Sequence, residues 1–83
     1  MYLLIISPRA QKELRKIKKI YQRSIKLAIE EIKEDPFLGK PLTRDLIGKY
    51  ACKVGGYRII YKVNKTDKVI NILSAGHRSK IYD

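Results

Sequence analysis

The sequence predicts an α+β fold, in which an N-terminal strand and a two-helix hairpin pack on a C-terminal antiparallel sheet. Three observations support this prediction: an apolar run at residues 2–6, apolar residues at helical spacing over residues 10–32, and β-branched and aromatic segments over residues 50–75. A chain of 83 residues accommodates one core, so we assign residues 1–83 to a single domain.

The opening run at residues 2–6 is apolar throughout and is closed by Ser7 and Pro8. Continuous apolar runs of this length are typical of strands covered on both faces, so we expect this strand to lie centrally or beneath the helices. Five apolar residues are too few for a membrane span or for the hydrophobic part of a secretory signal.

A helical region is expected to follow at once. Serine can cap free N–H groups, and proline at the first helical position lacks the N–H that would be unpaired. One helix cannot enclose a core, so we expect a break near residues 19–22, and Asp35-Pro36 ends the second helix. The apolar face at spacings of three or four comprises Ala10, Leu14, Ile17, Tyr21, Ile25, Ala28 and Ile32.

The last third of the chain predicts a three-stranded antiparallel meander. Residues 37–48 contain two glycines and a proline and predict a loop with at most a short helical turn. Segments 50–54, 57–63 and 69–75 are rich in β-branched and aromatic residues. They are separated by Gly55-Gly56 and by residues 64–68.

The net charge favours an anionic partner. Lys and Arg number 19 against 8 Asp and Glu, which gives a formal charge of +11. Such a field attracts nucleic acid or acidic protein segments. The single Cys52 excludes an internal disulfide, and with one histidine it cannot form a Cys/His metal site, so we predict a cytoplasmic protein without a bound metal.

The predicted register gathers cations on one face of the sheet. A two-residue turn at Gly55-Gly56 places Lys53 opposite Arg58. A second hairpin centred in residues 64–68 puts Arg58 opposite Ser74, and strand alternation then brings Arg78 to the same side. Like charges facing each other are destabilising without an intervening anion, and a phosphate is the expected one. The alternative is an ordinary solvated basic surface.

The opposite face is expected to pack on the helices. Alternation also points His77 to this side, whereas a bulge at Gly76 would turn it toward the cations, so we keep His77 as a possible catalytic residue. The residues assigned to this core side are Cys52, Val54, Tyr57, Ile59, Tyr61, Val63, Val69, Leu73 and Ala75.

Several motifs together resemble the RelE family of bacterial and archaeal toxins. The string VGGYRIIY at residues 54–61 is followed by Gly76-His77-Arg78 and by Ile81-Tyr82. Ser7-Pro8, Asp35-Pro36 and the Lys-Pro-Leu run at residues 40–42 also match. The resemblance covers nearly the whole chain, and the order and spacing of the motifs are more specific than any one of them.

The resemblance implies a RelE-like microbial RNase fold. It also implies a toxin of a type II toxin–antitoxin system that cleaves messenger RNA at the ribosomal A site by 2′-hydroxyl attack, with no metal or other cofactor. Carried over by position, Arg58 stabilises the phosphate, Arg78 is the second catalytic arginine, Tyr82 orients the RNA and Lys53 is a catalytic lysine. Ala51 stands where some members carry another basic residue, which leaves the identity of the general base open.

The implied partners are a RelB-like antitoxin with an acidic or partly disordered segment, the ribosome and messenger RNA, with no membrane. Two further functions remain open: a ParE-like, non-enzymatic inhibitor of DNA gyrase, and a catalytically weakened RNA-binding member. We expect additional RNA contacts from Arg44, Lys49, Lys62 and Lys80. The helical cations are expected to form a solvated face that attracts ribosomal RNA: Arg9, Lys12, Arg15, Lys16, Lys18, Lys19, Arg23 and Lys26.

Overall fold

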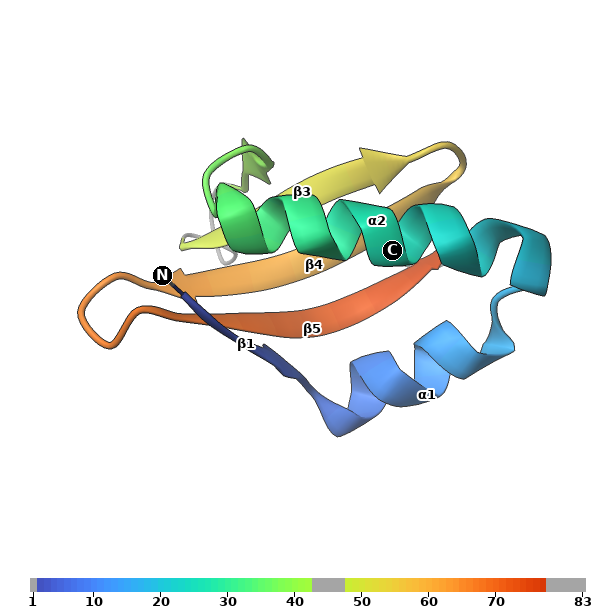
Figure 1. The fold of residues 1–83 in the computed structure, drawn as a ribbon, viewed down its shortest axis with the longest axis horizontal. Helices are drawn as coiled ribbons and strands as arrows, with labels where there is room; N and C mark the ends of the chain where they lie inside the picture. Colours follow the sequence, from blue (N-terminus) through green and yellow to red (C-terminus); the bar gives the residue numbers. More distant parts are fainter. Residues whose placement is uncertain (1, 43–47, 78–83) are drawn as a thin grey trace.

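Two helices and a five-stranded mixed sheet make up the described part of the protein (Figure 1). The computed structural model describes residues 2–42 and 48–77. Across the sheet the order is β1-β5-β4-β3-β2, with β1 parallel to β5 and the other pairs antiparallel. The predicted α+β class is confirmed. Along the chain the elements are β1 (Leu3–Ile6), α1 (Pro8–Lys16), α2 (Lys19–Glu34), β2 (Lys40–Pro41), β3 (Lys49–Val54), β4 (Tyr57–Asn64) and β5 (Val69–His77).

β1 lies at the edge of the sheet, so the prediction that it is covered on both faces is wrong. Leu3 and Ile5 are 62% and 45% exposed, whereas Leu4 and Ile6 pack against the core. Among the described elements, the helices lie on one face of the sheet, and β1 pairs with β5 alone. The chain turns away directly after β1, where the Ser7 N–H donates to the Ile72 carbonyl at 3.0 Å.

The helix termini agree with the prediction. Ser7 is the N-cap of α1, where its Oγ accepts from the backbone N–H of Ala10 at 3.1 Å, and Pro8 is the first helical residue. α2 ends at Glu34, and its C-cap Asp35 lies immediately before Pro36. Neither of the described helices is long and apolar enough to cross a membrane.

The break between the helices occurs at residues 17–18, slightly before the predicted position, and a glutamine supports it. The Gln22 side-chain amide donates to the carbonyls of Leu14 and Ile17, at 3.3 and 2.8 Å. Carbonyls in the last turn of a helix have no partner within the helix, so Gln22 satisfies groups that α1 leaves unpaired. This explains how the chain turns without a glycine or proline.

The core lies between the helices and one face of the sheet (Figure 1). Burying a Leu- or Ile-sized side chain contributes about 1.5–3 kcal/mol, so a core of this size depends on every member. The buried helical residues are Ala10, Ile17, Ile25, Ala28, Ile29 and Ile32, and the buried strand residues that meet them are Ile59, Tyr61, Ile70, Ile72 and Ala75.

The first hairpin has the predicted register, with Lys53 opposite Arg58. The second does not, because Arg58 pairs with Gly76 rather than with Ser74. The connecting turn occupies residues 65–68, and the register shifts where Ile60 pairs with Ser74 but Tyr61 pairs with Ile72. Leu73 is therefore an extra residue in β5, which forms a bulge.

The bulge decides which side chains of β5 enter the core. On the N-terminal side of the bulge, Ile70 and Ile72 are the β5 residues buried in the core. The prediction that Val69 and Leu73 belong to the core is therefore wrong. After the bulge, Ala75 is fully buried in the core, as predicted. A single extra residue reverses the alternation of a strand, which accounts for both outcomes.

Substituting Gln22 with alanine should destabilise the helix break. Gln22→Ala is expected to lower the free energy of unfolding by about 1–2 kcal/mol, because two carbonyls lose their donor. Urea denaturation followed by circular dichroism measures the change. Arg23→Ala removes the neighbouring exposed side chain and should change stability by no more than a few tenths of a kcal/mol. Equal effects of the two substitutions would contradict the role assigned to Gln22.

Candidate functional site

The face of the sheet away from the helices carries a cluster of cations. Pairing of β3 with β4 places Lys53 opposite Arg58. The same pairing places Lys49 opposite Lys62, and Lys40 of β2 pairs with β3 beside them. Directly paired residues project to the same side, and these alternate with residues of the core. We call this surface the cationic face; it comprises Lys40, Lys49, Lys53, Arg58 and Lys62.

The strands that carry the cationic face are rich in basic residues, and β1 to β5, over the bounds given above, contain no aspartate or glutamate. Cross-strand pairs of like charge are destabilising. Lys53 and Lys62 are exposed and can be solvated, but Arg58 is partly buried among them. The arrangement therefore favours binding of an extended polyanion across β3 and β4.

A hollow of about 680 Å³ lies beside Lys53 and Arg58. Its cations can hold phosphate oxygens, and the Arg58 guanidinium suits bidentate contact. Burial, with a smaller contribution from Glu31, raises the pKa of the Cys52 thiol, which therefore stays protonated near neutral pH. Cysteine at this position is a wall residue rather than a nucleophile. The hollow is lined by Leu38, Gly39, Lys40, Pro41, Leu42, Ala51, Cys52, Lys53 and Arg58.

The wall formed by β2 is held in place by Tyr61. This side chain is fully buried, and its hydroxyl donates to the Pro36 carbonyl at 2.9 Å and accepts from the Gly39 N–H at 3.0 Å. A Cβ at position 39 would lie 2.5 Å from the Tyr61 oxygen, so only glycine fits there. Burial raises the pKa of Tyr61 to about 12, although the Gly39 hydrogen bond acts in the opposite direction.

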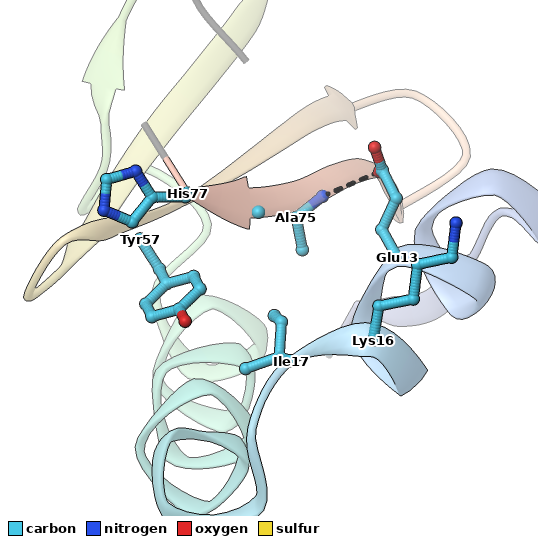
Figure 2. A pocket seen from close by; sticks show the side chains of 7 residues that line it. Glu13, Lys16, Ile17, Tyr57, Ala75 and His77 are labelled. Atoms are coloured by element: carbon cyan, nitrogen blue, oxygen red, sulfur yellow. Dashed lines mark hydrogen bonds between the residues drawn. The ribbon is translucent and has the colours of Figure 1, made fainter. Parts of the chain in front are cut away.

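A carboxylate from α1 holds β5 at its bulge. Oε1 of Glu13 accepts from the Ser74 hydroxyl at 2.8 Å and from the Ala75 N–H at 3.2 Å, as Figure 2 shows for the second bond. Arg9 forms an ion pair with the other carboxylate oxygen, with Nε 3.5 Å away. These bonds fix the part of β5 that places Gly76 opposite Arg58.

His77 lies on the helix side of the sheet. It pairs with Tyr57, and the two rings meet edge to face with centroids 5.6 Å apart. Tyr57 packs against the core, so the sheet separates both rings from Arg58. The bulge falls at Leu73 and not at Gly76, so it does not turn His77 toward the cations; a catalytic role for His77 stays a prediction.

The structure brings together four of the predicted site residues: Lys49, Lys53, Arg58 and Lys62. Lys40 was missed, because nothing in the sequence marks residues 40–41 as a strand rather than a loop. Within residues 2–42 and 48–77, no three His, Cys, Asp or Glu side chains are grouped so that they could hold a metal ion. The other predicted site residues, Arg44, Arg78, Lys80 and Tyr82, lie outside the described residues.

Comparisons with known proteins agree on one group of toxins. Residues 4–82 match the family described as the ParE toxin of type II toxin–antitoxin system, parDE. Toxin RelG of Mycobacterium tuberculosis is 29% identical over 83 residues, which cover 98% of this chain and 95% of RelG. The isolated Escherichia coli RelE toxin superposes with a TM-score of 0.81 and 30% identity, covering 99% of this chain and 92% of that one. A chain of the RelBE2 toxin–antitoxin complex of M. tuberculosis superposes with a TM-score of 0.83 and is 26% identical. This match covers 93% of the present chain and 98% of that one.

Removing the Tyr61 hydroxyl should destabilise the protein. Tyr61→Phe keeps the buried ring but leaves the Pro36 carbonyl and the Gly39 N–H without their partner, so the free energy of unfolding should fall by about 1–3 kcal/mol. Urea denaturation at pH 7 gives the value. Tyr50→Phe, which changes a partly buried ring stacked on Tyr61, is the matched control and should cost less. An unchanged midpoint for Tyr61→Phe would show that the hydroxyl contributes nothing.

The raised pKa of Tyr61 also predicts a dependence on pH. The phenol ionises near pH 10 in the unfolded chain but only near 12 in the folded protein, so the unfolded state loses its proton first. The stabilisation is therefore complete below pH 10 and is lost as the pH rises from about 10 to about 12. Stability measured at intervals over this range should fall more steeply for the natural protein than for Tyr61→Phe. If the stability of both proteins fell equally with rising pH, the raised pKa assigned to Tyr61 would be contradicted.

Proposed function

Since this chain belongs to the ParE toxin family of type II toxin–antitoxin systems, within the RelE/ParE superfamily, we propose that it is an endoribonuclease that cuts messenger RNA at the ribosomal A site. The observation that carries the proposal is the pairing of Lys53 with Arg58 on the cationic face, beside a hollow of about 680 Å³ that both residues line. Similarity to toxins named RelG and RelE supports the same activity.

The proposed reaction uses the RNA's own hydroxyl group. The 2′-oxygen attacks the adjacent phosphorus, a bond from phosphorus to the 2′-oxygen forms, and the bond to the 5′-oxygen breaks. The products are a 2′,3′-cyclic phosphate and a 5′-hydroxyl. The protein has to accept the proton of the nucleophile, neutralise the dianionic phosphorane and protonate the leaving oxygen. No cofactor is required for these steps.

Fixed cations supply most of what this reaction needs. Arg58 binds the non-bridging phosphate oxygens, and a preorganised donor of this kind lowers the barrier by roughly 3 kcal/mol. Lys53, directly across the strand pair, is the candidate base, because Ala51 offers no ionisable group. By the resemblance, Arg78 and Tyr82 complete the site as a second phosphate ligand and as the residue that orients the RNA.

The surrounding cations would hold the flanking RNA. Lys49 and Lys62 extend the cationic face along β3 and β4 and can each neutralise a backbone phosphate. Arg44 and Lys80 are assigned the same role from the sequence alone. Contacts of this kind carry no base specificity, and binding through them weakens steeply as the salt concentration rises.

The proposed partner in the resting cell is a RelB-like antitoxin. The similar M. tuberculosis chain was solved in a toxin–antitoxin complex, RelBE2. An acidic, partly disordered antitoxin segment would neutralise the cationic face and exclude RNA from it. Both the antitoxin and translating ribosomes are in the cytoplasm, where we place the protein.

A second candidate function follows from the name of the matching family, which is that of the ParE toxins. On this alternative the chain is a non-enzymatic inhibitor of DNA gyrase, and the cationic face binds a protein or DNA. A supercoiling assay separates the two, since gyrase inhibition without RNA cleavage supports the alternative. RNA binding without turnover would instead indicate a catalytically weakened member, a possibility to which Ala51 points.

Removing the Arg58 guanidinium should abolish most cleavage. Arg58→Ala is expected to lower the rate on translating ribosomes at least 100-fold, because a donor worth roughly 3 kcal/mol is lost. Primer extension on the message detects the cuts. Lys33→Ala removes one positive charge from the last turn of α2, away from the cationic face and from the cations assigned to ribosomal RNA, and should retain near-normal cleavage. Intact message in the presence of folded natural protein would overturn the proposed function.

A further inference from the structure

A second hollow, of about 320 Å³, lies on the helix side of the sheet between α1 and the ends of β4 and β5 (Figure 2). It is distinct from the hollow on the cationic face, with which it shares no lining residue. The side chains around it are of two kinds, aromatic on one wall and charged on the other. Its lining consists of Glu13, Lys16, Ile17, Tyr57, Ala75, Gly76 and His77.

The aromatic wall is formed by Tyr57 and His77. Their rings lie edge to face at 5.6 Å, and Tyr21 supports Tyr57 from α2 with ring centroids 5.3 Å apart. Rings braced in this way present a fixed apolar surface to a planar ligand. A nucleobase stacks favourably on an aromatic side chain, and this contact needs no particular base because every base has a planar face.

The charged wall comes from α1 and is preorganised. Glu13 does not swing freely, because Ser74 and Ala75 both donate to its Oε1. Lys16 follows one helical turn later and lies beside it, across the hollow from the rings (Figure 2). A fixed carboxylate accepts from an exocyclic amino group, and a nearby ammonium group donates to a ring carbonyl or nitrogen. Cytosine and adenine carry such an amino group, whereas uracil has a carbonyl in its place.

The hollow and the cationic face are joined around one edge of the sheet. β1 ends at Ile6, opposite Ile72, so beyond that point β5 is the outermost of the described strands. Gly76 lines the hollow and pairs with Arg58, one strand spacing away, at about 4.8 Å. Glycine presents no side chain to obstruct an RNA strand that passes from one side to the other.

From these observations we propose that the hollow is a nucleobase subsite for single-stranded RNA, which takes a cytosine or adenine in preference to uracil. The inference rests on the proposed RNA-binding function and deepens it. A strand whose phosphate is held at Arg58 sends a neighbouring base around the edge of β5 at Gly76. The base then stacks on Tyr57 and donates its amino group to Glu13.

Binding of short oligonucleotides to the full-length protein tests the subsite. Fluorescence anisotropy with labelled hexacytidylate and hexauridylate should show about tenfold tighter binding of the cytidylate. Glu13→Gln should bring the ratio close to one, because the amide can donate as well as accept. Glu30→Gln makes the same change in charge on exposed α2 and should keep the tenfold ratio. If Glu13 were only structural, its substitution would weaken both oligonucleotides equally.

A second measurement needs no variant. In NMR spectra of the natural protein, the ring resonances of Tyr57 and His77 should shift on addition of hexacytidylate. The subsite would be overturned if the two oligonucleotides bound with equal affinity and the resonances of Tyr57 and His77 did not shift. The proposed function would still stand if that binding depended on Arg58. Failure of the folded protein to bind either oligonucleotide would overturn the subsite, whereas the proposed function is tested separately by primer extension on translating ribosomes.

Discussion

One buried hydroxyl group, that of Tyr61, links the core to the surface that we assign to RNA. The ring belongs to the core beneath α2, while the hydroxyl bonds both to the segment after α2 and to the segment before β2. When a buried polar group is left without its hydrogen-bond partner, the free energy of unfolding falls by about as much as several ordinary hydrogen bonds contribute to it. The position of Lys40, which is exposed, and of the wall around the hollow therefore depends on how the core packs.

The cationic face shows a conflict between stability and binding. Lys53 opposite Arg58 and Lys49 opposite Lys62 are pairings that oppose folding, because each brings like charges together across two strands. An anion on this face removes that repulsion and stabilises the folded state in proportion to its affinity. RNA and an acidic antitoxin segment satisfy the same requirement, so on the proposed function they compete for one surface.

Features set by neighbouring residues were predictable from the sequence, and those set by distant contacts were not. The two adjacent glycines, Gly55 and Gly56, indicate a two-residue turn. The length of that turn sets the register, so the pairing of Lys53 with Arg58 could be predicted. The bulge at Leu73 depends instead on Glu13, whose partner Ser74 is 61 residues away in the chain. The site was therefore predicted on β3 and β4 but misplaced by two residues on β5. The edge position of β1 likewise depends on its pairing with β5, a strand from the other end of the described chain.

The parallel pairing of β1 with β5 joins the first of the described strands to the last of them. Among these strands β1 pairs with β5 alone, and α1 packs mainly on β5, so the N-terminal elements cannot complete their packing without residues 69–77. Contacts between distant parts of a chain also form slowly, since a long loop has to close first. β1 and α1 should therefore form and unfold together with β5, as one cooperative unit that joins residues far apart in the sequence.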